Sequence, residues 1–138
     1  MAVGRDSDCQ YGSPSWAAGL VGRWGGPARG LPRRGDIVWL TFNPQAGHEQ
    51  AGRRPAVVLS PLAYNAKVGL ALLCPITSAV KGYPFEVDLP PGLPVTGVIL
   101  ADQVKSLDWQ ARDVEFISPL PAAATREILQ KIGLLLAE

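Results

Sequence analysis

Three polar segments interrupt the apolar stretches of this chain and carry the side chains that could do chemistry. The first, residues 47–55 (GHEQAGRRP), holds an imidazole, a carboxylate, an amide and two adjacent guanidinium groups. The second, residues 75–85 (PITSAVKGYPF), offers two hydroxyls and a lysine, and the third, residues 101–105 (ADQVK), is a polar interruption at a strand end. A guanidinium stays charged at any working pH and donates two parallel hydrogen bonds. The segments therefore suit contacts with a phosphate ester.

Short apolar strands must position these segments. Residues 37–42 (IVWLTF) are rich in β-branched and aromatic residues and predict a strand that is buried on both faces. Its Trp39 and Phe42 are expected in the core, and Trp109 in a packed turn. Strict alternation in residues 85–89 predicts one buried and one solvated face. Further strands are predicted at residues 56–59, 69–76, 97–104 and 114–117.

Two helices are predicted around this sheet. Ser60 followed by Pro61 predicts an N-cap with proline in the first turn of a short helix that ends at Lys67. A second helix is expected at about residues 121–136 and should pack on the sheet. Its apolar residues recur at helical spacing: Ala124, Ile128, Ile132 and Leu135. The fold class is therefore mainly β or α+β, with about five to six mostly antiparallel strands in a small barrel and a C-terminal helix.

Composition sets limits on function. The 138 residues allow one domain, and 47% apolar with 18% charged residues predict a folded chain. The net charge of +1 is uneven, because residues 1–34 carry five arginines and two acids while residues 35–138 carry more acids than bases. The core lacks the broad basic face of a nonspecific nucleic-acid binder. Any RNA contact must use a local cluster.

Residues 1–32 differ from the rest. They are dominated by Gly, Ser, Pro and Arg without periodicity, which predicts a flexible and dispensable extension before a domain at residues 33–138. Cys9 and Cys74 lack metal-ligand spacing, and Cys74 is expected to be a reduced, buried thiol. No apolar run approaches the length of about 20 residues of a membrane span. We therefore expect a cytoplasmic protein without a metal, a cofactor or a membrane partner.

Read in order, the polar segments resemble the MazF/PemK toxin family. Three motifs carry the resemblance in this order: Gly-Asp followed by an apolar residue (residues 35–37), G-x-E-Q-x-G-x-R-P (residues 47–55) and Val-Val-Leu-Ser (residues 57–60). Blocks at residues 81–87 (KGYPFEV) and 100–109 (LADQVKSLDW) resemble the same family. All blocks occur in order and at the right spacing, and the resemblance spans residues 34 to about 136.

The resemblance implies an SH3-like barrel that forms a homodimer and a toxin that a cognate antitoxin neutralises. It implies sequence-specific, metal-independent cleavage of single-stranded mRNA, in which the 2′-hydroxyl attacks the adjacent phosphate. The products would be a 2′,3′-cyclic phosphate and a 5′-hydroxyl. By position it implies catalytic roles for Arg54, Thr77 and Glu49, where Glu49 either accepts the 2′-hydroxyl proton or orients Arg54. Because His48 is the sole histidine, a two-histidine scheme is excluded.

Further RNA contacts are predicted from residue type. Amides can read base edges bidentately, hydroxyls donate to phosphate, and cations attract it. The residue at position 48, often Ser in the family, leaves the base preference open. The predicted RNA-binding residues are His48, Gln50, Arg53, Ser78, Lys81 and Gln103.

Two other functions fit the same fold. A toxin that resembles the gyrase poison CcdB would bind its target without cutting RNA, and would need a C-terminal contact but no Arg/Thr site. An inactive relative would bind only an antitoxin peptide. The intact GHEQAGRRP and PITS segments favour the nuclease, and an RNA cleavage assay separates all three.

Overall fold

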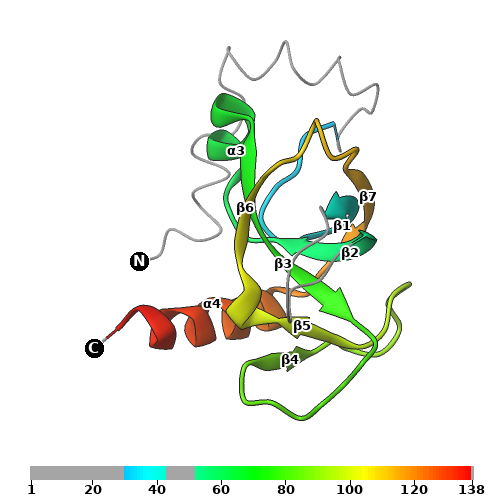
Figure 1. Ribbon diagram of the computed structural model, residues 1–138, viewed down its shortest axis with the longest axis vertical. Coiled ribbons are helices and arrows are strands. Elements are labelled where there is room, and N and C mark those ends of the chain that lie inside the picture. Colours follow the sequence, from blue (N-terminus) through cyan, green and yellow to red (C-terminus); the bar gives the residue numbers. More distant parts are fainter. Residues whose placement is uncertain (1–29, 43–51, 138) are drawn as a thin grey trace.

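The computed structural model describes residues 30–42 and 52–137, which fold into a strongly curved sheet with one helix at each end (Figure 1). The helices are α3 (Leu62–Val68) and α4 (Ala122–Leu136), with a 3-10 turn, η1 (Ala101–Gln103), between two strands. The strands are β1 (Asp36–Phe42), β2 (Gly52–Val58), β3 (Leu70–Thr77), β4 (Glu86–Asp88), β5 (Val98–Leu100), β6 (Lys105–Asp108) and β7 (Glu115–Pro119).

The strands pair in the order β4-β5-β3-β2-β1-β7, and every pair is antiparallel. The predicted fold class is confirmed, but the described residues form seven strands rather than five or six. The predicted strand at residues 97–104 ends at Leu100, because η1 turns the chain there. The chain resumes as β6, which was not predicted. As a result β5 pairs with the last residues of β3, whereas β6 pairs with its first half.

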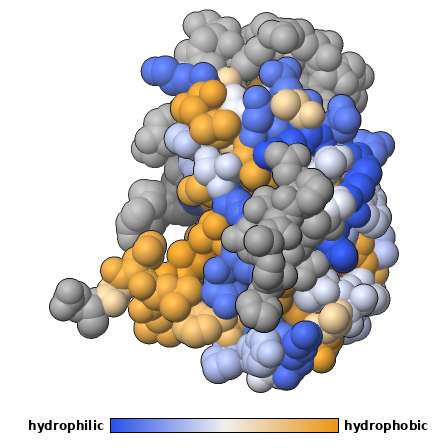
Figure 2. Space-filling view, in the orientation of Figure 1, coloured by the Kyte–Doolittle hydropathy of each residue, from blue (hydrophilic) through white to orange (hydrophobic). Residues whose placement is uncertain are grey.

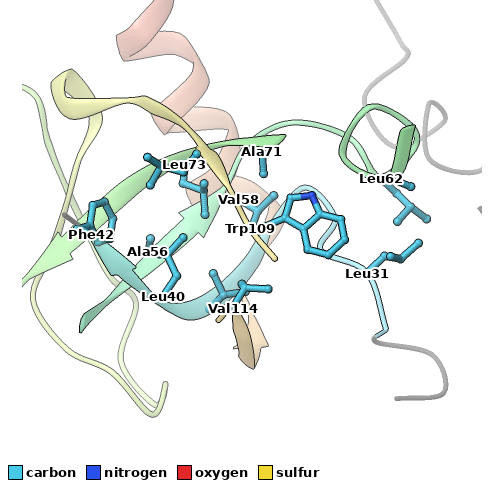
Figure 3. Packing of buried hydrophobic residues seen from close by; sticks show 13 residues of the cluster. Leu31, Leu40, Phe42, Ala56, Val58, Leu62, Ala71, Leu73, Trp109 and Val114 are labelled. Carbon is cyan, nitrogen blue, oxygen red and sulfur yellow. The ribbon is translucent and has the colours of Figure 1, made fainter. Parts of the chain in front are cut away.

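The sheet separates two apolar cores, because successive side chains of a strand point to opposite faces. Ile37 and Val38, for example, belong to different cores. The inner core is enclosed by the curved sheet (Figure 3) and contains Leu31, Val38, Leu40, Phe42, Ala56, Val58, Leu62, Ala66, Ala71, Leu73, Leu107, Trp109 and Val114. The helix-side core is built with α4 and contains Ile37, Val57, Leu59, Cys74, Ile76, Val87, Ile99, Ala101, Leu120, Ala124 and Ile128.

The aromatic residues of β1 divide between core and surface. Phe42 is buried as predicted, and so is Trp109. The prediction that Trp39 belongs to the core is wrong, since 38% of this residue is exposed. Trp39 shares the face of Ile37, and only the Ile37 end of that face contributes to the helix-side core.

A buried polar network closes the end of the molecule at α3. The Asn65 amide donates to the carbonyls of Pro32 (2.9 Å) and Ser60 (3.0 Å), and its own backbone carbonyl accepts from the Trp109 indole (2.9 Å). The Ser60 hydroxyl donates to Asn65 Oδ1 and accepts from the Leu72 amide (2.9 Å). Ser60 is therefore not the predicted N-cap, and Pro61 takes that position without a side-chain cap bond.

The same network shows where the domain begins. Leu31 is only 4% exposed and packs in the inner core, and Pro32 is tied to Asn65. The predicted boundary after residue 32 is therefore too late, because Leu31 and Pro32 are part of the fold.

The C-terminal helix is confirmed, and its first half is the buried half. Ala124 and Ile128 are buried, and Ile132 packs against the helix-side core. The last turn projects away from the sheet, so that 71% of Leu134 and 82% of Leu136 are exposed. Figure 2 shows the resulting apolar surface over α4. Within the described residues, neither helix has the length and apolar character that crossing a membrane requires.

Candidate functional site

Arg54 of β2 and Thr77 of β3 lie at one end of the ladder between these two strands. The ladder pairs Val58 with Leu73 and Ala56 with Pro75. The ladder ends at Ala56 and Pro75, and Arg54 and Thr77 each lie two residues beyond that pair. Because residues two apart share a face of a strand, both side chains lie on the face that carries the inner core. The sheet thus brings the two predicted catalytic residues to neighbouring strand ends.

The surroundings of these two side chains suit contact with an anion at the edge of the core. Arg54 is half-buried and pairs across the sheet with Leu40, an inner-core residue. Thr77 is 8% exposed, and its Oγ1 accepts a hydrogen bond from the Ala79 amide (3.1 Å). Since that bond uses a lone pair of Oγ1, the hydroxyl hydrogen is left to donate to a bound group.

The backbone of Gly97 packs closely against the Thr77 carbonyl. Its φ of +119° lies in the region that favours glycine, and a Cβ built at this position would come within 2.1 Å of the Thr77 carbonyl oxygen. Only glycine permits this approach. Sequence reasoning missed the role of Gly97, although a glycine at the start of a predicted strand is typical of close backbone approach.

The loop that follows Thr77, residues 78–85, is held by a carboxylate that sequence reasoning also missed. The Glu86 side chain accepts hydrogen bonds from the amides of Lys81 (3.1 Å) and Gly82 (2.9 Å). Ser78 and Lys81 are exposed on this loop. The loop therefore presents a hydroxyl and a cation close in sequence to Thr77.

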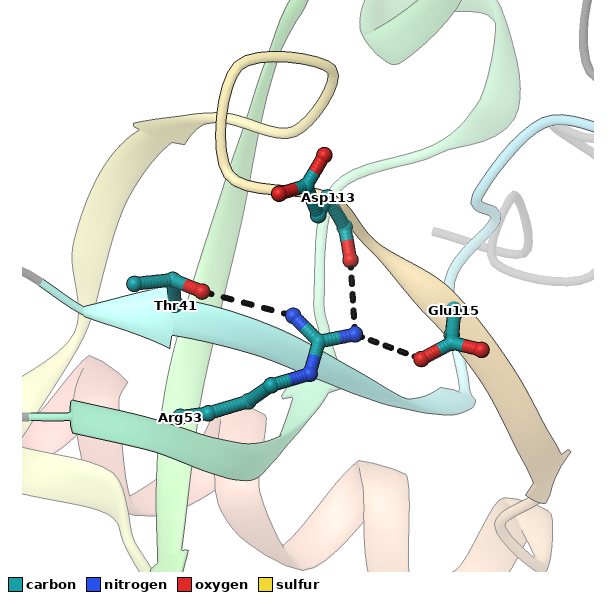
Figure 4. A network of polar contacts seen from close by, with 4 residues as sticks. All are labelled: Thr41, Arg53, Asp113 and Glu115. Atoms are coloured by element: carbon teal, nitrogen blue, oxygen red, sulfur yellow. Dashed lines mark hydrogen bonds and ion pairs between the residues drawn. The ribbon is translucent and has the colours of Figure 1, made fainter.

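Arg53 points the other way. On the face opposite Arg54 it bonds to Thr41 Oγ1 (3.3 Å), the Asp113 carbonyl (2.9 Å) and the Glu115 carboxylate (2.6 Å), as Figure 4 shows. These contacts span β2, β1 and the segment that enters β7. The structure therefore separates the two adjacent arginines instead of joining them in one cationic cluster.

The remaining predicted residues are placed differently. Gln103 is half-buried at the end of η1, and η1 lies against β3, where the Cys74 thiol approaches the Ala101 carbonyl (3.8 Å). His48, Glu49 and Gln50 lie outside the described residues.

Cys74 is fully buried in the helix-side core. Burial, with a smaller contribution from the Asp102 carboxylate, raises the pKa of this thiol to about 12. The reactive thiolate is therefore suppressed at neutral pH. The prediction that Cys74 is buried is confirmed. In residues 30–42 and 52–137 no three His, Cys, Asp or Glu side chains gather as a metal site would need.

Fold and site together define a small β-barrel protein with a C-terminal helix and a candidate anion site at one end of the barrel. The model of the family described as PemK-like, MazF-like toxin of type II toxin–antitoxin system matches residues 33–136. The chain belongs to this family.

Individual relatives agree with this assignment. The endoribonuclease toxin MazF of Escherichia coli K12 is 56% identical over 85 residues, which cover 62% of this chain and 76% of the relative. The crystal structure of MazF from Deinococcus radiodurans is similar with a TM-score of 0.74 and 57% identity, over 77% of this chain and 96% of that one. A MazE–MazF complex structure from the same organism is similar with a TM-score of 0.69 and 50% identity, over 78% and 96% of the two chains.

Proposed function

We propose that this chain is an endoribonuclease toxin that cuts single-stranded mRNA at specific sequences. The observation that supports the proposal is the β2–β3 ladder, which ends at Ala56 and Pro75, two residues from Arg54 and from Thr77, so that strand alternation puts both residues on the same face of the sheet. Membership of the toxin family and 56% identity to a MazF endoribonuclease support the reaction class.

In the proposed reaction the ribose 2′-hydroxyl attacks the adjacent phosphorus. The bond from O2′ to phosphorus forms and the bond from phosphorus to O5′ breaks. The 2′-hydroxyl loses its proton and the departing O5′ takes one up, so the products are a 2′,3′-cyclic phosphate and a 5′-hydroxyl. The Arg54 guanidinium holds two nonbridging oxygens as negative charge develops on them. Thr77 donates one more hydrogen bond, because Oγ1 already accepts the Ala79 amide. Glu49 either accepts the 2′-hydroxyl proton or orients Arg54.

Metal-independence is part of the proposal. Arg54 supplies the positive charge that a cation supplies in metal-dependent nucleases. No cofactor is invoked, since attack by an internal hydroxyl needs neither an oxidant nor an added nucleophile.

The RNA would be held by residues around this pair. Ser78 and Lys81 on the exposed β3–β4 loop, and Gln103 on η1, are the described candidates for phosphate and base contacts. His48 and Gln50, which precede Arg53 and Arg54 in the sequence, complete the proposed set. Arg53 is left out of this set, because its side chain bonds to Thr41 and Glu115 on the face opposite Arg54.

A homodimer is proposed through α4. Leu129, Leu134, Leu135 and Leu136 of this helix are exposed, and Figure 2 shows an apolar surface over α4. Such a surface is costly in water and is normally covered by a partner. A second copy related by two-fold symmetry could cover both helices at once. Light scattering should give the mass of a dimer at micromolar concentration, whereas a stable monomer there would contradict this part of the proposal.

The proposed protein partner is a small acidic antitoxin whose tail lies across the site in the cytoplasm. The similarity to the MazF of a MazE–MazF complex supports such a partner. A tail with acids and apolar anchors could fold over Arg54 and Lys81 and exclude RNA. Tight binding of a cognate partner that left cleavage unaffected would contradict this mechanism.

One assay tests the reaction. The protein should cleave single-stranded RNA in excess chelator, and should leave intact the same RNA with a 2′-methoxy group at the cut site, because the nucleophile is blocked. Loss of activity in chelator, or cleavage of the modified substrate, would replace transphosphorylation by metal-dependent hydrolysis. If no RNA is cleaved, the result would instead favour the alternative function, a binding module with the same fold.

A further inference from the structure

Lys131 of α4 reaches across to the chain that enters β4. Its Nζ donates to the carbonyl oxygens of Pro84 (2.8 Å) and Glu86 (3.0 Å), and lies 3.5 Å from the Glu127 carboxylate one turn earlier. The side chain is only 25% exposed. Three acceptors thus surround an ammonium that has three hydrogens, so Lys131 is committed to these contacts.

Glu86 connects Lys131 to the loop that precedes β4. While its backbone carbonyl accepts from Lys131, its carboxylate accepts from the amides of Lys81 and Gly82, and its amide donates to the Tyr83 carbonyl (3.1 Å). One residue therefore connects α4 to the middle of the β3–β4 loop, residues 78–85 (Figure 1).

The other end of the same loop is anchored at Thr77. Its Oγ1 accepts from the Ala79 amide, and the Ser78 carbonyl accepts from the Val80 amide (3.1 Å). The loop is thus fixed at Thr77 on one side and by Glu86 and Lys131 on the other. The proposed RNA contacts Ser78 and Lys81 are two of its exposed residues between these points.

We infer that Lys131 is a positioning residue for RNA cleavage, acting from outside the site by fixing the β3–β4 loop relative to Thr77. The inference rests on the proposed function. Without the ammonium, the Pro84 and Glu86 carbonyls lose their donor and the Glu86 carboxylate loses its fixed place. The loop then holds the RNA less accurately, and displacement of about 1 Å at a reacting centre can cost about 100-fold in rate.

The test compares Lys131→Met, which keeps the aliphatic stem, with Lys131→Arg, which restores a cation with donors. Lys67→Met makes the same chemical change on the exposed side of α3 and serves as control. Single-turnover cleavage at saturating RNA is measured at a temperature well below each Tm. We expect Lys131→Met to slow this rate about 10-fold or more, Lys131→Arg to recover most of it, and Lys67→Met to match the wild type. Affinity for the 2′-methoxy RNA should change much less than the rate.

A second readout does not depend on activity. Amide hydrogen exchange at Lys81 and Gly82 should accelerate in Lys131→Met and return toward the wild-type rate in Lys131→Arg. Unchanged exchange, or a folded Lys131→Met protein that cleaves saturating RNA at the wild-type rate, would overturn the inference. If the wild-type protein cleaves no RNA, the proposed function fails, while the exchange measurement still decides whether Lys131 holds the loop.

Discussion

The polar side chains at the two ends of the β2–β3 ladder differ in their burial and in their hydrogen bonds. At the α3 end, Ser60 and Asn65 are buried, and their side chains bond to groups of the same chain. At the other end, which we call the site end, Arg54 is half-buried and Thr77 keeps a hydroxyl hydrogen to donate. A buried polar network that is satisfied internally stabilises the fold, whereas a half-buried cation and a hydroxyl with a hydrogen to donate suit contact with an anion. Substitutions should therefore affect stability at one end and catalysis at the other.

The largest effect is expected at Arg54. Arg54→Ala should lower the single-turnover cleavage rate about 100-fold or more, the usual result of losing one preorganised donor. Arg54→Lys should recover little, because a point charge cannot make the two-pronged contact. Thr77→Ala should cost less, since it removes a single neutral donor. A folded Arg54→Ala protein with the full rate would refute the site while leaving the family assignment intact.

At the α3 end, Asn65→Ala should act on stability. The substitution leaves the Ser60 and Pro32 carbonyls without the Asn65 donor, and each unsatisfied buried group costs about 1–3 kcal/mol. We expect a loss of about 3 kcal/mol in the free energy of unfolding, measured in urea, which corresponds to a Tm lower by about 10–20 °C.

Lys67→Ala, on the exposed side of α3, is the matched control and should change stability by less than about 0.5 kcal/mol. The folded fraction of Asn65→Ala should cleave RNA at the wild-type rate. A specific loss of catalysis there would break the division between the two ends.

The sequence predicted the two ends to different extents, because one depends on local sequence patterns and the other on contacts between residues far apart in the sequence. The strand segments other than β6 and the C-terminal helix follow from local periodicity. The proposed roles of Arg54 and Thr77 come from family motifs. The roles of Ser60 and Asn65 depend on contacts between residues up to 44 apart, such as the Trp109 indole bond, and no local pattern encodes them.

The same limit explains the errors at β1 and at the N-terminal boundary. Trp39 has the residue type of a core strand, but the face it occupies is open beyond α4. Leu31 lies in a Gly- and Pro-rich stretch that reads as a linker, although the inner core receives its side chain. The composition of a segment does not show which distant elements of the fold cover it and which leave it exposed.

Gly97 allows the site end to be tested without touching a catalytic group. Gly97→Ala should destabilise the fold by about 2 kcal/mol from backbone strain and slow cleavage about 10-fold, because the Cβ would push on the Thr77 carbonyl. Gly92→Ala is the control, since Gly92 has a φ of +91° but nothing within 4 Å of the added Cβ. It should lower Tm without changing the rate. Equal rates for the two variants would show that the contact with Thr77 is irrelevant to catalysis.

Cys74, between the two ends, predicts a pH effect on stability. The folded state raises the pKa of the thiol from 9.0 to about 12, so the protonated form is the one that folding favours. The contribution of the thiol to the free energy of unfolding is complete below pH 9. It is lost as the pH rises toward 12, by at most about 1.4 kcal/mol per pH unit. Urea unfolding from pH 7 to 10 should show a steeper loss in the wild type than in Cys74→Ala, with Cys9 present in both. Parallel curves would contradict the raised pKa.

The smallest effect is expected at Arg53, and it separates the two faces of the site end. Arg53 bonds to Thr41 and Glu115 on the face opposite Arg54, and the Glu115 side chain is 71% exposed. Exposed ion pairs contribute about 0–1 kcal/mol. Arg53→Ala should therefore lower the free energy of unfolding by less than about 1 kcal/mol and leave the salt dependence of RNA binding unchanged. Glu115→Gln, which removes the partner's charge, should produce a similar small loss, and the double variant should show little further loss. A fall in the slope of log affinity against log salt by about one for Arg53→Ala alone would mean that Arg53 leaves Glu115 to bind a phosphate, and that the RNA contacts both faces of β2.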